Sequence, residues 1–276
     1  MYIVKILGCC LMFILSGIAV AQDTELYKRE YHIIGKESLP YRMMLPKDFD
    51  ETKTYPLVLF LHGAGERGND NELQLTHGAS LFADNGNRER FPAIVIFPQC
   101  PVTDYWSNVK VDRNKTGRKK FVYKKGGAPT KALKLVMSLM EKQVALSFVD
   151  TARVYVVGLS MGGMGTFEIL ARKPQMFAAA MPICGGGHPQ TVTSYAGSVP
   201  LWIFHGAKDD VVGPGFSIEM VSAILGAGGF PRFTLFDSAN HNSWDPAFRE
   251  PDFLSWLFDK STSPGQARKG HGGNPQ

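Results

Sequence analysis

Short apolar runs alternate with amphipathic stretches along most of this chain. Residues 57–61, which follow a proline, and residues 93–97, which lie between two prolines, are continuous apolar runs. Such runs are typical of strands buried on both faces of a parallel sheet. Similar runs predict strands at 154–157, 177–181, 201–204 and 232–236. Ahead of them, β-rich segments at 27–34 and 39–45 are separated by a Gly-Lys-Glu-Ser turn, which predicts an antiparallel hairpin at one edge of the sheet.

Amphipathic helices are predicted between these strands. Apolar residues recur at helical spacing over 130–147, directly after a proline, which indicates a crossover helix. Further helices are predicted at 161–172, 216–225 and 252–258. This alternation favours an α/β fold with a mostly parallel central sheet and helices on both faces. Active residues of such a sheet lie in the loops after the carboxyl ends of the strands.

The two ends of the chain differ from the middle. Lys5 precedes an apolar stretch that ends in Ala-Val-Ala at 19–21, which predicts a secretory signal peptide over 1–21. An uncleaved anchor is the alternative, but the apolar run falls short of the roughly 20 residues that a spanning helix needs. We therefore expect a secreted or periplasmic protein without membrane attachment after cleavage. Residues 22–260 are predicted to form one domain, and the polar segment 261–276 a disordered tail.

Composition and charge exclude little beyond nucleic-acid binding. The net charge of +5 over 276 residues is too small to favour a nucleic-acid partner. Much of the excess lies in residues 110–125, which we interpret as a solvated loop, with a subsite for acidic sugars or polyanions as the alternative. Once the signal peptide is removed, Cys100 and Cys184 remain. An oxidising compartment would permit a disulfide between them, and two reduced thiols remain equally open.

The segment Gly158-Leu159-Ser160-Met161-Gly162 follows a predicted strand and leads into a predicted helix. In that context, Gly-x-Ser-x-Gly indicates a nucleophile elbow, a sharp turn from which the serine oxygen projects clear of the sheet. The amino end of the following helix would favour negative charge developing at this point. The pentapeptide alone would be a weak signal, and a chance glycine turn is the alternative. We predict that Ser160 is the nucleophile.

A serine hydroxyl needs a base, and in this kind of fold the chain order is serine, acid, histidine. His241, in the loop after the last predicted strand, is the histidine that satisfies this order. His205 lies at the end of a predicted strand, at the start of the turn that holds the best acid, and is expected to shape that turn. Of the adjacent pair Asp209 and Asp210, the His-Gly-x-x-Asp-x-x-Val pattern favours Asp209. Its predicted role is to orient the imidazole without taking the proton.

An oxyanion hole requires two backbone N–H groups that face the same point. One is predicted from Met161, the residue after the nucleophile, and the other from the loop after the third strand. That loop is rich in small residues at 62–68, and Ala64 is the first choice as donor, with Gly65 next. A plain glycine turn is the alternative reading of the loop.

Four motifs, at 61–68, 158–166, 205–212 and 241–244, together resemble those of bacterial secreted esterases of the α/β-hydrolase superfamily. The nearest groups are carbohydrate esterase family one, which contains feruloyl and acetylxylan esterases, and polyhydroxybutyrate depolymerase-like esterases. The catalytic domain of prolyl oligopeptidases is more distant. The resemblance implies an α/β-hydrolase fold and hydrolysis through an acyl-enzyme without metal or cofactor. It also implies ester substrates, often those of plant cell walls.

The resemblance further implies that Trp106 lines the substrate cleft, with loop packing as the alternative. Gly65 and Trp244 are also predicted to contact substrate. The leading hypothesis is therefore a secreted carboxylic ester hydrolase acting on acylated polysaccharide or oligosaccharide. A prolyl oligopeptidase-type peptidase and a non-catalytic binding module with a hydrolase fold are the alternatives. The motifs are specific for the catalytic triad and much less so for the substrate.

Overall fold

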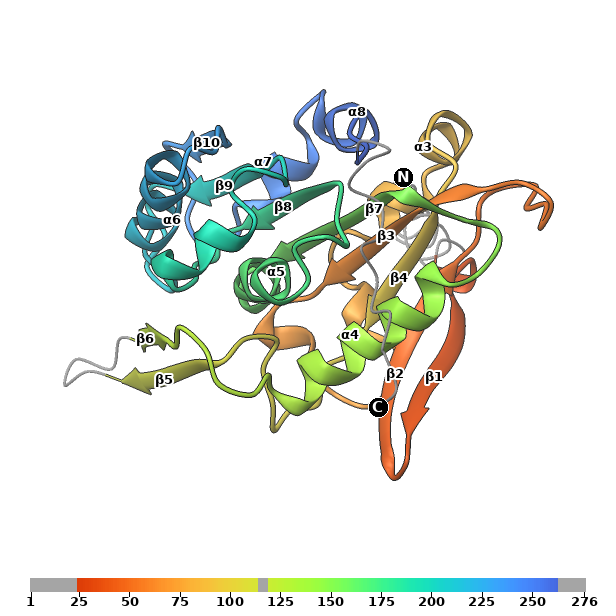
Figure 1. Ribbon diagram of the computed structural model, residues 1–276, viewed down its shortest axis with the longest axis horizontal. Coiled ribbons are helices and arrows are strands. Elements are labelled where there is room, and N and C mark those ends of the chain that lie inside the picture. The colour runs from red at the N-terminus through yellow and green to blue at the C-terminus, as the bar shows by residue number, and fades with distance from the viewer. Residues whose placement is uncertain (1–23, 114–118, 263–276) are drawn as a thin grey trace, which may run out of the picture.

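The computed structural model describes residues 24–113 and 119–262. The predicted signal peptide and most of the predicted tail lie outside these ranges. Within them, an eight-stranded sheet has the order β1-β2-β4-β3-β7-β8-β9-β10 (Figure 1). Its strands are β1 (Lys28–Ile34), β2 (Glu37–Met44), β3 (Tyr55–Leu61), β4 (Ile94–Pro98), β7 (Val149–Leu159), β8 (Ala179–Ile183), β9 (Trp202–Gly206) and β10 (Arg232–Phe236).

Strand direction divides the sheet into an antiparallel edge and a parallel body. β1 pairs antiparallel with β2, and β2 pairs antiparallel with β4. Every other pairing in this sheet is parallel. The predicted fold class, a mostly parallel sheet with an antiparallel N-terminal hairpin, is confirmed. Because β3, β7, β9 and β10 run in the same direction, the loops after them meet at one edge of the sheet.

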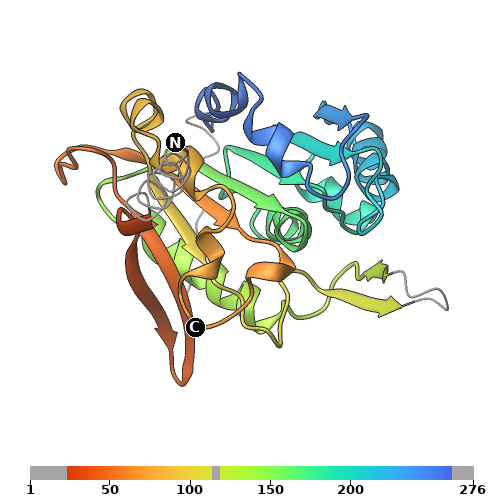
Figure 2. The same ribbon diagram turned by 180° about the vertical axis from the view of Figure 1, so that it is seen from behind.

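Helices cover both faces of the sheet, as the opposite views in Figures 1 and 2 show. α4 (Lys131–Val144), α5 (Met161–Arg172) and α6 (Gly215–Gly226) contribute to the core on one face. α2 (Ala79–Ala83), α7 (Trp244–Phe248) and α8 (Phe253–Phe258) contribute to the core on the other, and α3 (Asn85–Arg90) follows α2. These short α2 and α3 helices were not predicted. No helix of the described ranges is both long and apolar enough to cross a bilayer.

Strand β3 shows why continuous apolar runs predict central strands. Its seven residues are all buried. Leu57, Leu59 and Leu61 belong to the core under α4 and α5, whereas Val58 and Phe60 belong to the core on the opposite face. Since successive side chains of a strand point to opposite faces, a strand covered on both sides has to be apolar throughout. Burying each such side chain contributes about 1.5–3 kcal/mol.

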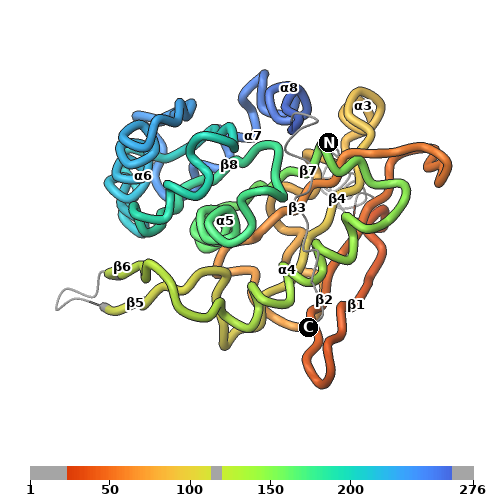
Figure 3. Tube along the Cα trace, viewed as in Figure 1, coloured from red at the N-terminus to blue at the C-terminus, as the bar shows by residue number. Residues whose placement is uncertain are grey.

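Two strands that were not predicted form an arm beside the main sheet. β5 (Val109–Arg113) and β6 (Lys119–Tyr123) pair antiparallel, and the backbone trace in Figure 3 shows them projecting from the body of the molecule. The expectation of a plain loop over the basic run is therefore wrong. Phe121 is buried against Met164 and Val212, while Lys120 and Val122 on either side of it are exposed. One face of the arm thus packs on the domain.

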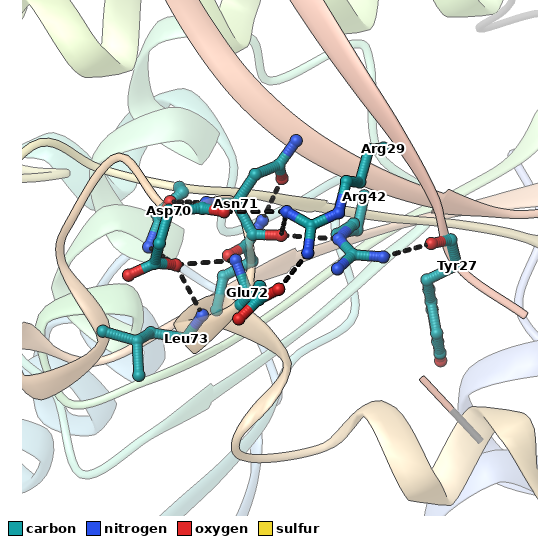
Figure 4. Close-up of polar contacts among 9 residues, drawn as sticks. Tyr27, Arg29, Arg42, Asp70, Asn71, Glu72 and Leu73 are labelled. Carbon is teal, nitrogen blue, oxygen red and sulfur yellow. Dashed lines mark hydrogen bonds and ion pairs between the residues drawn. The ribbon is translucent and has the colours of Figure 1, made fainter. Parts of the chain in front are cut away.

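A buried arginine ties the N-terminal hairpin to the loop after β3 (Figure 4). Arg42 is 8% exposed and donates to the carbonyl oxygens of Asn71 and Tyr27, at 2.6 Å each. On the same loop, the Asn71 N–H donates to Gln99 Oε1 at 2.7 Å, and Gln99 Nε2 donates to Asp70 Oδ1 at 3.0 Å. Hydrogen bonds to charged groups are the stronger ones in proteins. This network therefore fixes the loop that follows β3.

Candidate active site

Ser160 occupies a strained turn between β7 and α5. Its φ of 53° and ψ of −115° lie outside the regions that residues other than glycine prefer, at a cost of about 1–3 kcal/mol. Two hydrogen bonds hold the turn: the Ser160 N–H donates to the Ile183 carbonyl at 2.9 Å, and the Ser160 carbonyl accepts from the Met164 N–H at 3.0 Å. A Cβ at Gly162 would lie 1.8 Å from the carbonyl oxygen of Leu61. Glycine there lets α5 approach β3.

Three side chains that are distant in sequence form one chain of hydrogen bonds. Ser160 Oγ lies 2.9 Å from His241 Nε2, and His241 Nδ1 lies 2.8 Å from Asp209 Oδ2. The structure therefore brings together the serine, histidine and acid that the sequence analysis selected. The Asp209 side chain has no exposed area, and that of His241 is 19% exposed. The neighbouring Asp210 is exposed, and its N–H donates to Asn240 Oδ1 at 3.1 Å.

The carboxylate of Asp209 is surrounded by donors. Its Oδ1 accepts from the N–H groups of Val211 and Val212, both at 2.9 Å. Its Oδ2 faces His241 and also His205, whose Nε2 lies 3.2 Å away. Burial on its own would raise the pKa of Asp209, but the hydrogen bonds from His205 and His241 outweigh it and hold that pKa below its usual range. Asp209 is thus kept ionised, which is the state that can orient an imidazole.

His205 is a second, fully buried imidazole on this carboxylate. Its Nε2 lies 2.8 Å from the carbonyl oxygen of Val212 as well as facing Asp209, and both neighbours are acceptors, so Nε2 carries the hydrogen. Its Nδ1 lies 2.7 Å from Ser217 Oγ, and that hydroxyl donates to the Gly185 carbonyl at 3.0 Å. His205 therefore shapes the turn, as expected, and in addition donates to its acid.

The candidate oxyanion loop and the elbow each begin a helical turn. Met161 is the first residue of α5, and Ala64 is the first residue of the 3-10 helix η1 (Ala64–Glu66). The first N–H groups of a helix have no partner within it. Both residues line the same cavity as Ser160 and His241. This position suits two donors aimed at an oxygen of the substrate.

The cavity beside Ser160 has a volume of about 240 Å³. Gly65 and Trp244, both predicted substrate contacts, line it, and the Trp244 ring lies edge-on to His241 at 5.5 Å between centroids. Trp106 does not line it, which corrects the expectation for this residue. Trp106 is fully buried, and its Nε1 donates to the carbonyl oxygen of His62 at 3.1 Å. It packs beneath the loop after β3, which was the alternative reading.

Several residues of the cavity wall were not predicted. Apart from the residues already named, the lining consists of Gly63, Glu66, Tyr105, Phe121, Leu159, Met164, Val211 and Val212. Phe121 comes from the arm, and its signal was the short apolar run Phe-Val-Tyr within the basic segment. Glu66 lies in a motif that was recognised, but nothing in the sequence indicates where its carboxylate points.

Both cysteines of the described chain are free and buried, which settles the question left open between a disulfide and two thiols. Burial raises the pKa of both thiols. Cys184 lies behind the triad, with its sulfur, a carboxylate oxygen of Asp209 and a ring nitrogen of His241 within 4.8 Å of one another. Because Asp209 and His241 are already hydrogen-bonded to each other, we assign no metal to this cluster.

Comparison with known families gives a consistent result. The model of the Esterase family matches residues 34–247, which is most of the chain and includes every residue of the site. The chain belongs to the Esterase family. Among solved structures, a thermostable esterase superposes with a TM-score of 0.77 at 34% identity, over 87% of this chain and 64% of that one. A ferulic acid esterase superposes with a TM-score of 0.59 over 84% of this chain and 98% of that one. At 17% identity, the latter likeness shows the fold alone.

Two curated relatives resemble parts of the chain. The bifunctional acetylxylan esterase/xylanase of Neocallimastix patriciarum is 28% identical over 157 residues, which are 57% of this chain and 20% of that protein. The poly(3-hydroxyalkanoate) depolymerase C of Paucimonas lemoignei is 29% identical over 134 residues, which are 48% of this chain and 28% of that protein. The chain thus spans less than a third of the length of either relative.

Proposed function

We propose that this chain is a secreted serine carboxylic ester hydrolase that works through an acyl-enzyme. The hydrogen-bonded series from Ser160 through His241 to Asp209 carries the proposal. Membership of the Esterase family supports the same reaction class. A non-catalytic binding module does not require a strained serine that is linked through a histidine to a buried, ionised acid.

The reaction follows from the positions of these groups. Ser160 Oγ attacks the ester carbonyl while His241 Nε2 accepts its proton, and Asp209 stabilises the imidazolium that forms. The N–H groups of Met161 and Ala64 stabilise the negative oxygen of the tetrahedral intermediate. His241 then protonates the departing alcohol, which leaves the acyl group on Ser160. A water molecule, deprotonated by His241, hydrolyses this acyl-enzyme and restores the serine.

We further propose acylated plant polysaccharide or oligosaccharide, carrying acetyl or feruloyl esters, as the substrate class. The acetylxylan esterase among the similar proteins supports this choice. The predicted signal peptide at 1–21 supports action outside the cytoplasm. Hydrolysis of feruloyl, acetyl and longer acyl esters of sugars, compared with proline amides, separates this class from a peptidase. Mass analysis of the exported protein tests cleavage after residue 21.

The decisive experiment compares Ser160→Ala with wild type. Wild type should hydrolyse p-nitrophenyl acetate and react covalently with a fluorophosphonate probe, and Ser160→Ala should do neither. Ser194→Ala, at an exposed serine of the 3-10 helix η3 (Pro189–Ser194), is the matched control and should behave as wild type. Undiminished hydrolysis by Ser160→Ala would refute the proposed nucleophile.

A further inference from the structure

Glu66 places a carboxylate in the cavity wall that the proposed mechanism does not use. Glu66 is the last residue of η1, its side chain is 13% exposed, and it lines the cavity together with Ser160 and His241. Its Oε2 atom is buried and has no hydrogen-bond partner among the described residues. A buried acceptor without a donor lowers the stability of the fold. We therefore expect a donor from outside the described residues to bind this oxygen.

The carboxylate lies close to the reacting serine. A Cβ built at Gly63 would be 2.9 Å from Glu66 Oε2 and 3.6 Å from Ser160 Cβ. The side chains of Glu66 and Ser160 therefore flank the same point beside Gly63. The other oxygen, Oε1, lies 3.8 Å from His77 Nε2. A molecule bound at Ser160 would therefore be within reach of Oε2.

Neighbouring rings indicate on which side of the ester Glu66 lies. The His77 ring contacts the Trp244 ring at 5.0 Å between centroids, and Trp244 in turn contacts His241 at 5.5 Å. Glu66 and Trp244 both line the cavity, and His77 behind them contacts each, so this wall lies on the side of His241. Because the histidine protonates the departing oxygen, this wall faces the alcohol part of the ester.

The chemistry of the wall selects the group that would bind. An ionised carboxylate only accepts hydrogen bonds, so its partner is a neutral O–H or N–H donor or a cation, and in an ester of a sugar the neutral donors are hydroxyl groups. Among the residues that the structure describes, Glu66 is the only acid that lines the cavity, whereas Ca²⁺ and Mg²⁺ require about six oxygen ligands. Arg67 adds positive charge nearby, with its guanidinium 5.1 Å from the centre of the Tyr105 ring that also lines the cavity. These features favour a neutral hydroxyl group.

We propose that Glu66 accepts a hydrogen bond from a hydroxyl group on the alcohol part of the substrate, in the cavity that Trp244 also lines. An acceptor beside an aromatic ring suits a sugar, which presents hydroxyl groups at its edge and C–H groups on its face. Glu66 would then distinguish sugar esters from esters of simple alcohols. This inference rests on the proposed function and assigns a specificity-determining residue to it.

The test compares two acetate esters that differ in hydroxyl groups on a six-membered ring. We would measure kcat/KM for a monoacetylated methyl xyloside and for cyclohexyl acetate, and take their ratio. Wild type should prefer the sugar ester, and Glu66→Gln should lower the ratio about 10- to 100-fold, as expected for loss of one hydrogen bond to a charged group. Glu72→Gln, on the same loop but outside the cavity lining, is the matched control and should leave the ratio unchanged.

Other outcomes would overturn the assignment. An equal loss on both esters in Glu66→Gln would mean that the carboxylate only supports the loop or holds water. If that variant does not fold, wild type can be tested with deoxy analogues of the xyloside, among which one missing hydroxyl should cost about 10- to 100-fold in kcat/KM. Equal rates across the analogues would overturn the inference. Failure of the proposed function itself would appear separately, as p-nitrophenyl acetate hydrolysis that does not depend on Ser160.

Discussion

Acidification should destabilise the protein through His62, the first residue of the candidate oxyanion loop. His62 is 1% exposed. Its Nε2 accepts the N–H of Cys100 at 3.0 Å, and its Nδ1 lies 2.6 Å from the carbonyl oxygen of Gly63. One nitrogen therefore has to be bare and the other protonated, which is the neutral imidazole. A second proton on Nε2 would point at the Cys100 N–H and break this arrangement.

The size of the effect follows from the pKa of His62 in the two states. Burial lowers it from 6.5 to about 4 in the folded protein. As the pH falls below 6.5, the unfolded chain binds a proton at this position and the folded chain does not, so the free energy of unfolding decreases. The decrease is complete near pH 4 and amounts to about 3 kcal/mol, since each pKa unit corresponds to about 1.4 kcal/mol.

Urea unfolding monitored by tryptophan fluorescence between pH 7 and pH 4 measures this loss. His62→Gln keeps an acceptor and a donor but cannot take the proton. Its stability at pH 7 should be lower than that of wild type, so the two proteins are compared by their change with pH. Between pH 7 and pH 4, wild type should lose about 3 kcal/mol more than the variant does. The difference between the two proteins removes the contribution of all other titrating groups. Parallel decreases in the two proteins would refute the reasoning.

Three further predictions concern the elbow, the acid and the thiols. Gly162→Ala should lower the free energy of unfolding by about 3 kcal/mol or more, because its Cβ would overlap the backbone of β3. Gly226→Ala, which has open space around its Cβ, is the control and should not lower it. Equal melting temperatures of the two variants would contradict this. Asp209→Asn should reduce kcat for p-nitrophenyl acetate by about 10⁴-fold, and a loss below tenfold would argue against its role. In a chain that begins at residue 22, Cys100 and Cys184 should react with a thiol reagent only after unfolding; rapid labelling of the native protein would disprove their burial.

Much of the sheet could be predicted because burial on two faces leaves a direct signal in the sequence. β10 and α5 have the predicted bounds, and α4 and α6 differ from theirs by a few residues. β8 is shifted by two residues from the predicted 177–181, because Phe177 and Ala178 are buried like strand residues although the strand begins only at Ala179. The arm was missed because lysines outnumber the apolar residues that anchor it. Segments as short as α2 and α3 carry too few turns for helical spacing to be read.

The candidate site divides in the same way. Chain order and strand ends select Ser160, Asp209 and His241 because each follows a strand of the parallel sheet. Trp106 was misjudged because an indole in a loop can equally face a cleft or lie beneath it, and only the hydrogen bond to the loop backbone decides between them. The position of Glu66 depends on the turn of η1, which a run of glycine and alanine does not reveal.

The arm separates the choice of substrate from the chemistry. Phe121 supplies part of the cavity wall, yet β5 and β6 form a sheet of their own and pair with no strand that carries Ser160, Asp209 or His241. Changes in its length or sequence could therefore remodel what the cavity admits while the reacting groups keep their spacing. Exchange of this one hairpin, in evolution or by design, could therefore change substrate selectivity without changing the main sheet.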